Sequence, residues 1–126
     1  MPPDARAVIP GDGTFSVAIV GESHYQPAIT AVCGPRTEEG VDDLEVEACL
    51  VLEDGNPYDS EAVRVDIRGR TVGYLSRAGA RHYRKALAKL GVRPVTAYCQ
   101  ARIRGGWDRG EDDQGFYGVY LDIPKV

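Results

Sequence analysis

Short segments in which apolar and polar residues alternate dominate this sequence, and they limit the folds that it can adopt. The clearest examples are residues 44–53 and 95–104, where every second side chain is apolar. A period of two is typical of strands with one buried and one solvated face. The sequence therefore predicts a mainly β protein whose strands are half polar.

The same pattern, bounded by turn-forming residues, predicts strands at residues 15–20, 44–53, 62–67, 71–75, 95–104 and 116–123. Arg68-Gly69-Arg70 predicts a tight hairpin between the third and fourth of these. One helix is expected from Ser76 to Leu90, and a short helical turn at residues 24–33 is weakened by Pro27 and Gly34. About six short strands with one or two helices predict a small OB-like antiparallel barrel.

The expected helix has two distinct faces. Its apolar stripe consists of Ala80, Tyr83, Leu87 and Leu90. Its outer face carries Arg81, Arg84, Lys85 and Lys89. We therefore expect the stripe to pack on the barrel and the four cations to face solvent.

The chain has 126 residues, which is enough for one domain. The proline- and glycine-rich residues 1–13 are expected to form a flexible lead-in, and residues 14–126 to form the domain. Three cysteines without a CxxC pair, no secretion signal and no long apolar run predict a cytoplasmic protein that does not contact a membrane.

The net charge of −4 conceals two blocks of opposite sign. Residues 1–63 carry −11, residues 64–109 carry +10 and residues 110–126 carry −3. The basic block is mostly arginine, whose planar fork suits phosphate. Two interpretations stay open: the blocks pair with each other across the fold, or the basic block binds an anionic ligand.

The most distinctive local sequence is Asn56-Pro57-Tyr58-Asp59. A turn accounts for the asparagine, the proline and the aspartate, but it does not require a tyrosine at the tip of a polar loop. An exposed ring held by a rigid turn is a stacking platform for an unpaired base. The motif therefore predicts either a plain turn or part of a single-stranded nucleic-acid site.

Three further groups fit the same two interpretations. His24 and Tyr25 either close the barrel mouth or form a second stacking surface, and alternation places Tyr74 inward with Val72. Arg77, in the first turn of the helix, is favoured there by a bound anion. Aromatic residues alternate with arginines on one face of the last two strands, which is either a nucleic-acid surface or a covered face: Tyr98, Arg102, Arg104, Phe116 and Tyr120.

No motif of a nucleophilic enzyme, a phosphate-binding loop or a metal site is found, so neither catalysis nor a cofactor is expected. Together, three segments resemble the HIRAN domain family in order and spacing. They are residues 17–26 (VAIVGESHYQ), Asn56-Pro57-Tyr58-Asp59 with Ala62-Val63, and Val72-Gly73-Tyr74-Leu75. The closing Gly118-Val119 and Leu121-Asp122-Ile123 are similar to the last strand of the family. The resemblance spans about residues 15–123.

The resemblance implies an OB-like barrel that binds single-stranded DNA and captures its free 3′-hydroxyl end. In that case His24 and Tyr58 would enclose the terminal bases, and Asp59 would accept a hydrogen bond from the 3′-hydroxyl. Asn56 would brace the turn, Arg77 would meet a phosphate, Tyr74 would line the path and Phe116 would close the pocket. Residues 17–26, which contain His24, would also bring Ser23 and Tyr25 to the nucleic-acid site.

The leading hypothesis is therefore a non-enzymatic module that recognises 3′ ends in DNA repair or replication-fork processing, with DNA-repair proteins as further partners. The alternative is a protein-interaction module on the same fold in which DNA binding is weakened or lost. The acidic first half favours the alternative, as does Ser23, which stands where a DNA-capturing member has a basic residue. A metal-dependent hydrolase is the third and weakest hypothesis.

Overall fold

Alternating segments fold into strands throughout the computed structural model, which describes residues 8–34, 37, 40–91, 96–107, 110 and 116–123. Six strands are found in these residues: β1 (Val17–Ala18), β2 (Val41–Leu52), β3 (Val63–Ile67), β4 (Arg70–Tyr74), β5 (Thr96–Gly105) and β6 (Gly118–Asp122). They accompany a 3₁₀ helix, η1 (Glu22–His24), and the helices α1 (Gln26–Cys33) and α2 (Arg77–Lys89). The element types agree with the sequence prediction, although β1 is shorter than expected.

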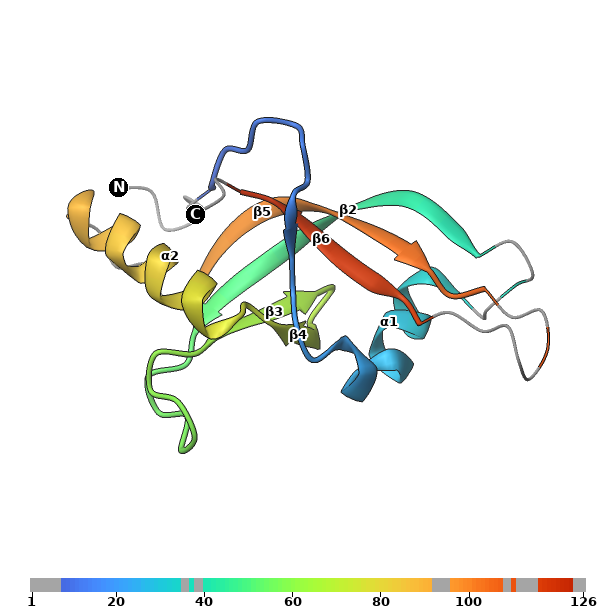
Figure 1. The fold of residues 1–126 in the computed structure, drawn as a ribbon, viewed down its shortest axis with the longest axis horizontal. Helices are drawn as coiled ribbons and strands as arrows, with labels where there is room; N and C mark the ends of the chain where they lie inside the picture. The colour runs from blue at the N-terminus through green and yellow to red at the C-terminus, as the bar shows by residue number, and fades with distance from the viewer. Residues whose placement is uncertain are drawn as a thin grey trace.

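The strands form one antiparallel sheet in the order β1-β6-β5-β2-β3-β4, and the sheet curls into a half-barrel (Figure 1). The two edges of the sheet meet just beyond β1. There the Val20 amide donates to the Tyr74 carbonyl at 2.8 Å, and the Tyr74 amide donates to the Val20 carbonyl at 3.0 Å. This pair of hydrogen bonds joins β4 to the chain that leaves β1, so the fold is consistent with a small OB-like barrel.

Gly73 allows the two edges to approach each other. A Cβ atom at this position would lie 2.6 Å from the Val20 carbonyl oxygen and 2.8 Å from Ile19 Cδ1. Any larger residue would therefore push the edges apart. The hairpin between β3 and β4 has a two-residue loop, and both Arg68 and Gly69 have positive φ angles of 51° and 77°. Two positive φ angles are typical of a type I′ turn, and the tight hairpin that the sequence predicted is confirmed.

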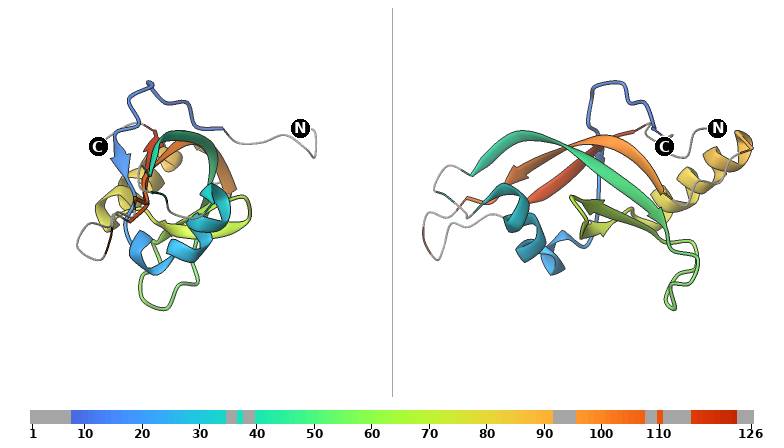
Figure 2. Two further views of the ribbon diagram at one scale, coloured as in Figure 1. Left: turned by 90° about the vertical axis from the view of Figure 1, so that its right-hand side faces the viewer. Right: turned by 180° about the vertical axis from the view of Figure 1, so that it is seen from behind.

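The strands curl around a central axis, as Figure 2 (left) shows, and their inward residues form the hydrophobic core. Every second residue of β2 is buried, from Val46 to Leu52, and the same holds for β3 and β5. Helix α2 lies at one end of the barrel and α1 toward the other (Figure 1). Ala80, Tyr83 and Leu87 of α2 join the core.

The helices begin and end where local chemistry allows. The Ser76 hydroxyl accepts a hydrogen bond from the Gly79 amide at 3.0 Å, which confirms the predicted cap of α2. Pro27 lies in the first turn of α1, where no amide hydrogen bond is lost, so it does not interrupt that helix. Leu90, which we expected in the buried stripe, caps the end of α2 and is 75% exposed. That prediction was wrong because the helix stops one residue earlier.

The segment before β1 crosses the outer face of β5 and β6. The Ile9 amide donates to the Tyr98 carbonyl, and the Gly13 amide donates to the Asp122 carboxylate at 3.0 Å. Residues 1–7 of the predicted lead-in lie outside the described residues. Within the described part of the chain, no helix combines the length and apolar character that a membrane crossing requires.

Candidate nucleic-acid interface

The loop between β2 and β3 presents Tyr58 to solvent. Its ring is 91% exposed, the largest exposed fraction among the described large hydrophobic residues. The Asn56 side-chain oxygen accepts hydrogen bonds from the amides of Tyr58 at 2.8 Å and Asp59 at 3.1 Å. Asn56 therefore braces the turn, and the exposed ring stands on an ordered backbone.

Asp59 lies next to this ring with one of its two carboxylate oxygens in use. Its Oδ1 accepts a hydrogen bond from the Glu61 amide at 3.0 Å, as in an ordinary Asx turn. No other hydrogen bond to this carboxylate is formed within the described residues. One oxygen thus holds the loop and the other remains available to a hydroxyl donor.

Arg84 fixes the same loop from outside. Its guanidinium donates to the Glu61 carbonyl at 2.7 Å, to the Ala62 carbonyl at 2.9 Å and to the Asp54 carboxylate at 2.8 Å. Its side chain is only 16% exposed. We expected Arg84 on the solvent face of the helix, and that expectation was wrong. Helix periodicity places it at the edge of the buried stripe but cannot show that a loop from elsewhere lies beside it.

Tyr74 of β4 and Tyr25, which follows η1, contact each other through their rings. Their ring centroids lie 6.4 Å apart at an angle of 49°, which brings η1 against β4. Burial raises the pKa of Tyr74 to about 12, and a hydrogen bond to Glu53 together with the charge of Glu53 adds to this effect. The hydroxyl therefore stays protonated at neutral pH. Tyr74 is half-buried and points outward, opposite Arg64, and not into the core with Val72.

Glu53 links Tyr74 to the loop, and sequence reasoning did not single it out. It accepts hydrogen bonds from Asn56 Nδ2 at 3.1 Å and from Arg64 Nη1 at 2.9 Å. Burial opposes ionisation, but the hydrogen bonds of Asn56, Tyr74 and Arg64 and the charge of Arg64 hold the pKa of Glu53 below its ordinary value. The outward position of Glu53 in the alternating pattern was the available signal.

Ser23 and His24 are exposed on η1. The Gln26 side chain at the start of α1 accepts from the Tyr117 amide at 2.9 Å and donates to the Tyr117 carbonyl at 3.1 Å. Phe116, the neighbour of Tyr117, is 63% exposed. In both Figure 1 and Figure 2, η1 and the loop between β2 and β3 project from the same side of the barrel.

Contacts connect Tyr25, Tyr74 and Asn56 with the loop that carries Tyr58 and Asp59, and we call these five residues the Tyr58 row. Tyr25 contacts Tyr74 directly. Glu53 connects Tyr74 to Asn56, because it interacts with both side chains. Arg77 is exposed at the start of α2, three residues beyond Tyr74. No contact joins His24 directly to Tyr58.

The alternative face on β5 and β6 is largely occupied by its own partners. The Arg102 guanidinium lies 4.0 Å from the centre of the Phe15 ring and donates to Glu45 at 2.9 Å. Arg104 lies 5.2 Å from the centre of the Tyr120 ring. The segment before β1 supplies Phe15, so residues 8–16 cover part of this face.

The acidic and basic blocks pair with each other in part of the structure. Among the residues that the structure describes, four ion pairs join the acidic and basic blocks: Glu53 with Arg64, Glu61 with Arg81, Asp54 with Arg84, and Glu45 with Arg102. Three of them neutralise acids at the base of the Tyr58 loop. In the described residues, five exposed cations have no acidic partner: Arg68, Arg70, Arg77, Lys85 and Lys89.

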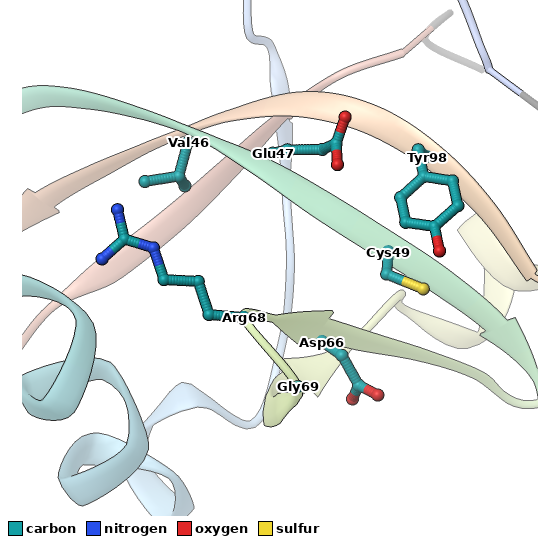
Figure 3. A pocket seen from close by; sticks show the side chains of 7 residues that line it. All are labelled: Val46, Glu47, Cys49, Asp66, Arg68, Gly69 and Tyr98. Atoms are coloured by element: carbon teal, nitrogen blue, oxygen red, sulfur yellow. The ribbon is translucent and has the colours of Figure 1, made fainter. Parts of the chain in front are cut away.

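A separate pocket of about 350 Å³ lies between β2, β5 and the β3–β4 hairpin (Figure 3). Arg68 extends from the hairpin toward Val46, while Cys49 points toward the ring of Tyr98. The acids Glu47 and Asp66 outnumber the one cation in the lining, so the pocket is unsuited to a phosphate. Nowhere in the residues that the structure describes do three His, Cys, Asp or Glu side chains gather as in a metal site.

The three cysteines form no disulfide. Burial raises the pKa of Cys99 to about 12, so this thiol is not ionised at neutral pH and is not a nucleophile. Comparisons of the chain with family models, with curated proteins and with solved structures find no match. Arguments about function therefore depend on the geometry above.

Proposed function

We propose that this chain is a HIRAN-like module that binds single-stranded DNA and holds its free 3′-hydroxyl end, without catalysing a reaction. One observation carries the proposal: an almost fully exposed ring stands next to a carboxylate with an available oxygen, on a loop clamped by Asn56 and Arg84. A clamped loop loses little conformational entropy when a ligand binds. The proposal also draws on the resemblance to HIRAN domains, which implies the capture of a 3′ end.

The proposed binding mode assigns one task to each group. Tyr58 stacks on the terminal base, and Asp59 accepts a hydrogen bond from the 3′-hydroxyl. His24 and Tyr25 lie on the other side of the bound nucleotides, and Arg77 meets a phosphate. The pairing of Glu53, Asp54 and Glu61 with arginines reduces the repulsion that these acids would exert on the strand.

The chemistry of Asp59 predicts discrimination between ends. A free hydroxyl donates to the carboxylate, whereas a 3′-phosphate brings about two negative charges to the same point. A hydrogen bond to a charged group contributes roughly 1.5–3 kcal/mol, so the preference for a 3′-hydroxyl should be about 10-fold or more.

Fluorescence anisotropy with two trinucleotides that differ only in a 3′-hydroxyl or a 3′-phosphate tests this mode. The wild-type protein should prefer the hydroxyl end, and Asp59→Asn should remove most of the preference. Asparagine keeps an oxygen for the Glu61 amide, so the loop itself should survive. Equal affinity of the wild-type protein for both ends would refute end recognition.

Tyr58 provides a second test of the same site. Stacking on one base contributes about 1–3 kcal/mol, so Tyr58→Ala should weaken binding about 5- to 150-fold. Tyr58→Phe should retain the affinity, and Tyr58→Leu should not. Because the ring is 91% exposed, none of the three changes should alter the unfolding temperature. If no DNA binds at low salt, the protein-interaction alternative replaces this proposal.

A further inference from the structure

Helix α2 carries four cations at a spacing of four residues: Arg77, Arg81, Lys85 and Lys89, here called the basic stripe. All four are exposed. Four residues of an α-helix advance by about 6 Å and turn by about 40° beyond a full circle, so the stripe is about 18 Å long and winds slowly around the helix. The spacing of its charges is comparable to that of neighbouring phosphates in an extended single strand.

Folding does not explain the stripe. Arg77, Lys85 and Lys89 have no acidic partner in the described residues, and Arg81 reaches only the exposed Glu61, at 3.6 Å. Like charges four residues apart destabilise a helix. The first turn of α2 contains no acid and begins with Arg77, although the helix dipole disfavours a cation there. A bound chain of anions would offset each of these unfavourable terms.

The stripe passes next to the proposed 3′-end site at Arg81, which pairs with Glu61. Arg84 of the same helix holds the carbonyls of Glu61 and Ala62, so the middle of α2 lies against the Tyr58 loop. Arg81, one turn before Lys85, is the residue that contacts Glu61 of that loop. From there Lys85 and Lys89 follow the helix away from the loop, toward the end of the molecule where α2 stops (Figure 1).

We infer that the basic stripe binds the phosphodiesters on the 5′ side of the captured 3′ end and guides the strand along α2. This inference rests on the proposed function, and it extends the contact from the terminal nucleotides to several more. It also sets the polarity of the bound strand, because the 3′ end lies at the Tyr58 loop and the 5′ direction follows α2 toward Lys89.

The test compares oligonucleotides of two lengths with the variant in which Arg81, Lys85 and Lys89 are all changed to Ala. A 3′-hydroxyl trinucleotide reaches the Tyr58 loop only, and a decanucleotide also covers the stripe. For single strands the logarithm of affinity falls with the logarithm of salt concentration by about 0.7 per neutralised phosphate. The triple variant should therefore reduce this slope by about 2 for the decanucleotide and leave the trinucleotide unchanged.

Charge-matched single variants control for a change in net charge. Lys85→Glu should weaken decanucleotide binding, whereas Arg70→Glu should not, because Arg70 is the first residue of β4, and β4 begins at the hairpin, on the side away from α2 (Figure 1). Alanine is the best helix former, and the triple variant also loses like-charge repulsion. Its unfolding temperature should equal or exceed that of the wild type, so unfolding cannot account for weaker binding.

The outcomes separate the two proposals. An unchanged decanucleotide slope, with the preference for 3′-hydroxyl ends intact, overturns the stripe and leaves the end site standing. If the triple variant has a reduced slope but the wild-type protein shows no preference for 3′-hydroxyl ends, end capture is overturned, together with the strand polarity derived from it. Failure of the wild-type protein to bind either oligonucleotide overturns both, and identical losses for both lengths overturn the stripe as a separate surface.

Discussion

Changing Arg84 to Ala should destabilise the protein, whereas changing Arg81 to Ala should not. The two residues lie on the same helix, but the Arg84 side chain is 16% exposed with three hydrogen bonds, and the Arg81 side chain is 58% exposed with one long ion pair. The pair therefore isolates the anchoring of the Tyr58 loop from the intrinsic effect of an arginine-to-alanine change.

The magnitude follows from the three contacts of Arg84. A hydrogen bond from a charged donor contributes roughly 1.5–3 kcal/mol when its partner is shielded. The Asp54 carboxylate is 54% exposed, so solvent screening limits its share to less than about 1 kcal/mol. The exposed Glu61 carbonyl regains water after truncation. We expect Arg84→Ala to lower the free energy of unfolding by about 2 kcal/mol, and Arg81→Ala to change it by less than about 0.5 kcal/mol.

Thermal and urea denaturation of the two variants measure these differences. For a domain of this size, 2 kcal/mol corresponds to a fall in unfolding temperature of about 7 °C. Arg84→Ala should also weaken trinucleotide binding, because Tyr58 then stands on a less ordered loop. If the two variants unfold at the same temperature, Arg84 does not anchor the loop and the argument for a preformed site is wrong.

Three more predictions concern stability. Folding lowers the pKa of Glu53, so the stability that its carboxylate provides is fully present above the ordinary pKa of 4.5 and is lost as pH falls through the pKa of the folded state. Glu53→Gln should therefore flatten the decrease of the urea midpoint below pH 4.5. Tyr83→Phe should raise the unfolding free energy by about 1 kcal/mol, because the buried hydroxyl has no hydrogen-bond partner in the described residues; a clear loss would reveal one. Gly73→Ala should lower the unfolding free energy by about 1–3 kcal/mol in the same denaturation assay, and a neutral result would show that the β4 edge does not depend on close contact with Val20.

Local patterns were sufficient to predict most of the fold. Alternation in β2, β3 and β5 specifies which residues are buried, and Ser76 specifies where α2 begins. Helix α1 was weakly predicted because proline was treated as a breaker, whereas Pro27 lies in the first turn, where it is tolerated. Closure of the half-barrel through Val20 and Tyr74 leaves no local signal apart from the small residue Gly73.

The candidate site was only partly predictable, for a similar reason. Turn chemistry accounts for Asn56 and for the Asp59 carboxylate, which accepts from the Glu61 amide, and the position of Tyr58 in a polar loop predicts its exposure. The contacts that connect the loop to the rest of the row come from residues distant in sequence, namely Glu53 to Tyr74 and Arg84 to the Glu61 carbonyl. Charge pairing between such residues depends on strand order and helix placement, which periodicity does not specify.

The most direct test of the proposed site is an amide-resolved NMR titration of the protein with a 3′-hydroxyl trinucleotide. The account predicts that the amides of Tyr58, Asp59 and Glu61 shift first and most, since the ring and the carboxylate of this loop receive the terminal nucleotide. Shifts concentrated instead around Arg102, Arg104 and Tyr120 on β5 and β6, with the loop amides unmoved, would contradict it.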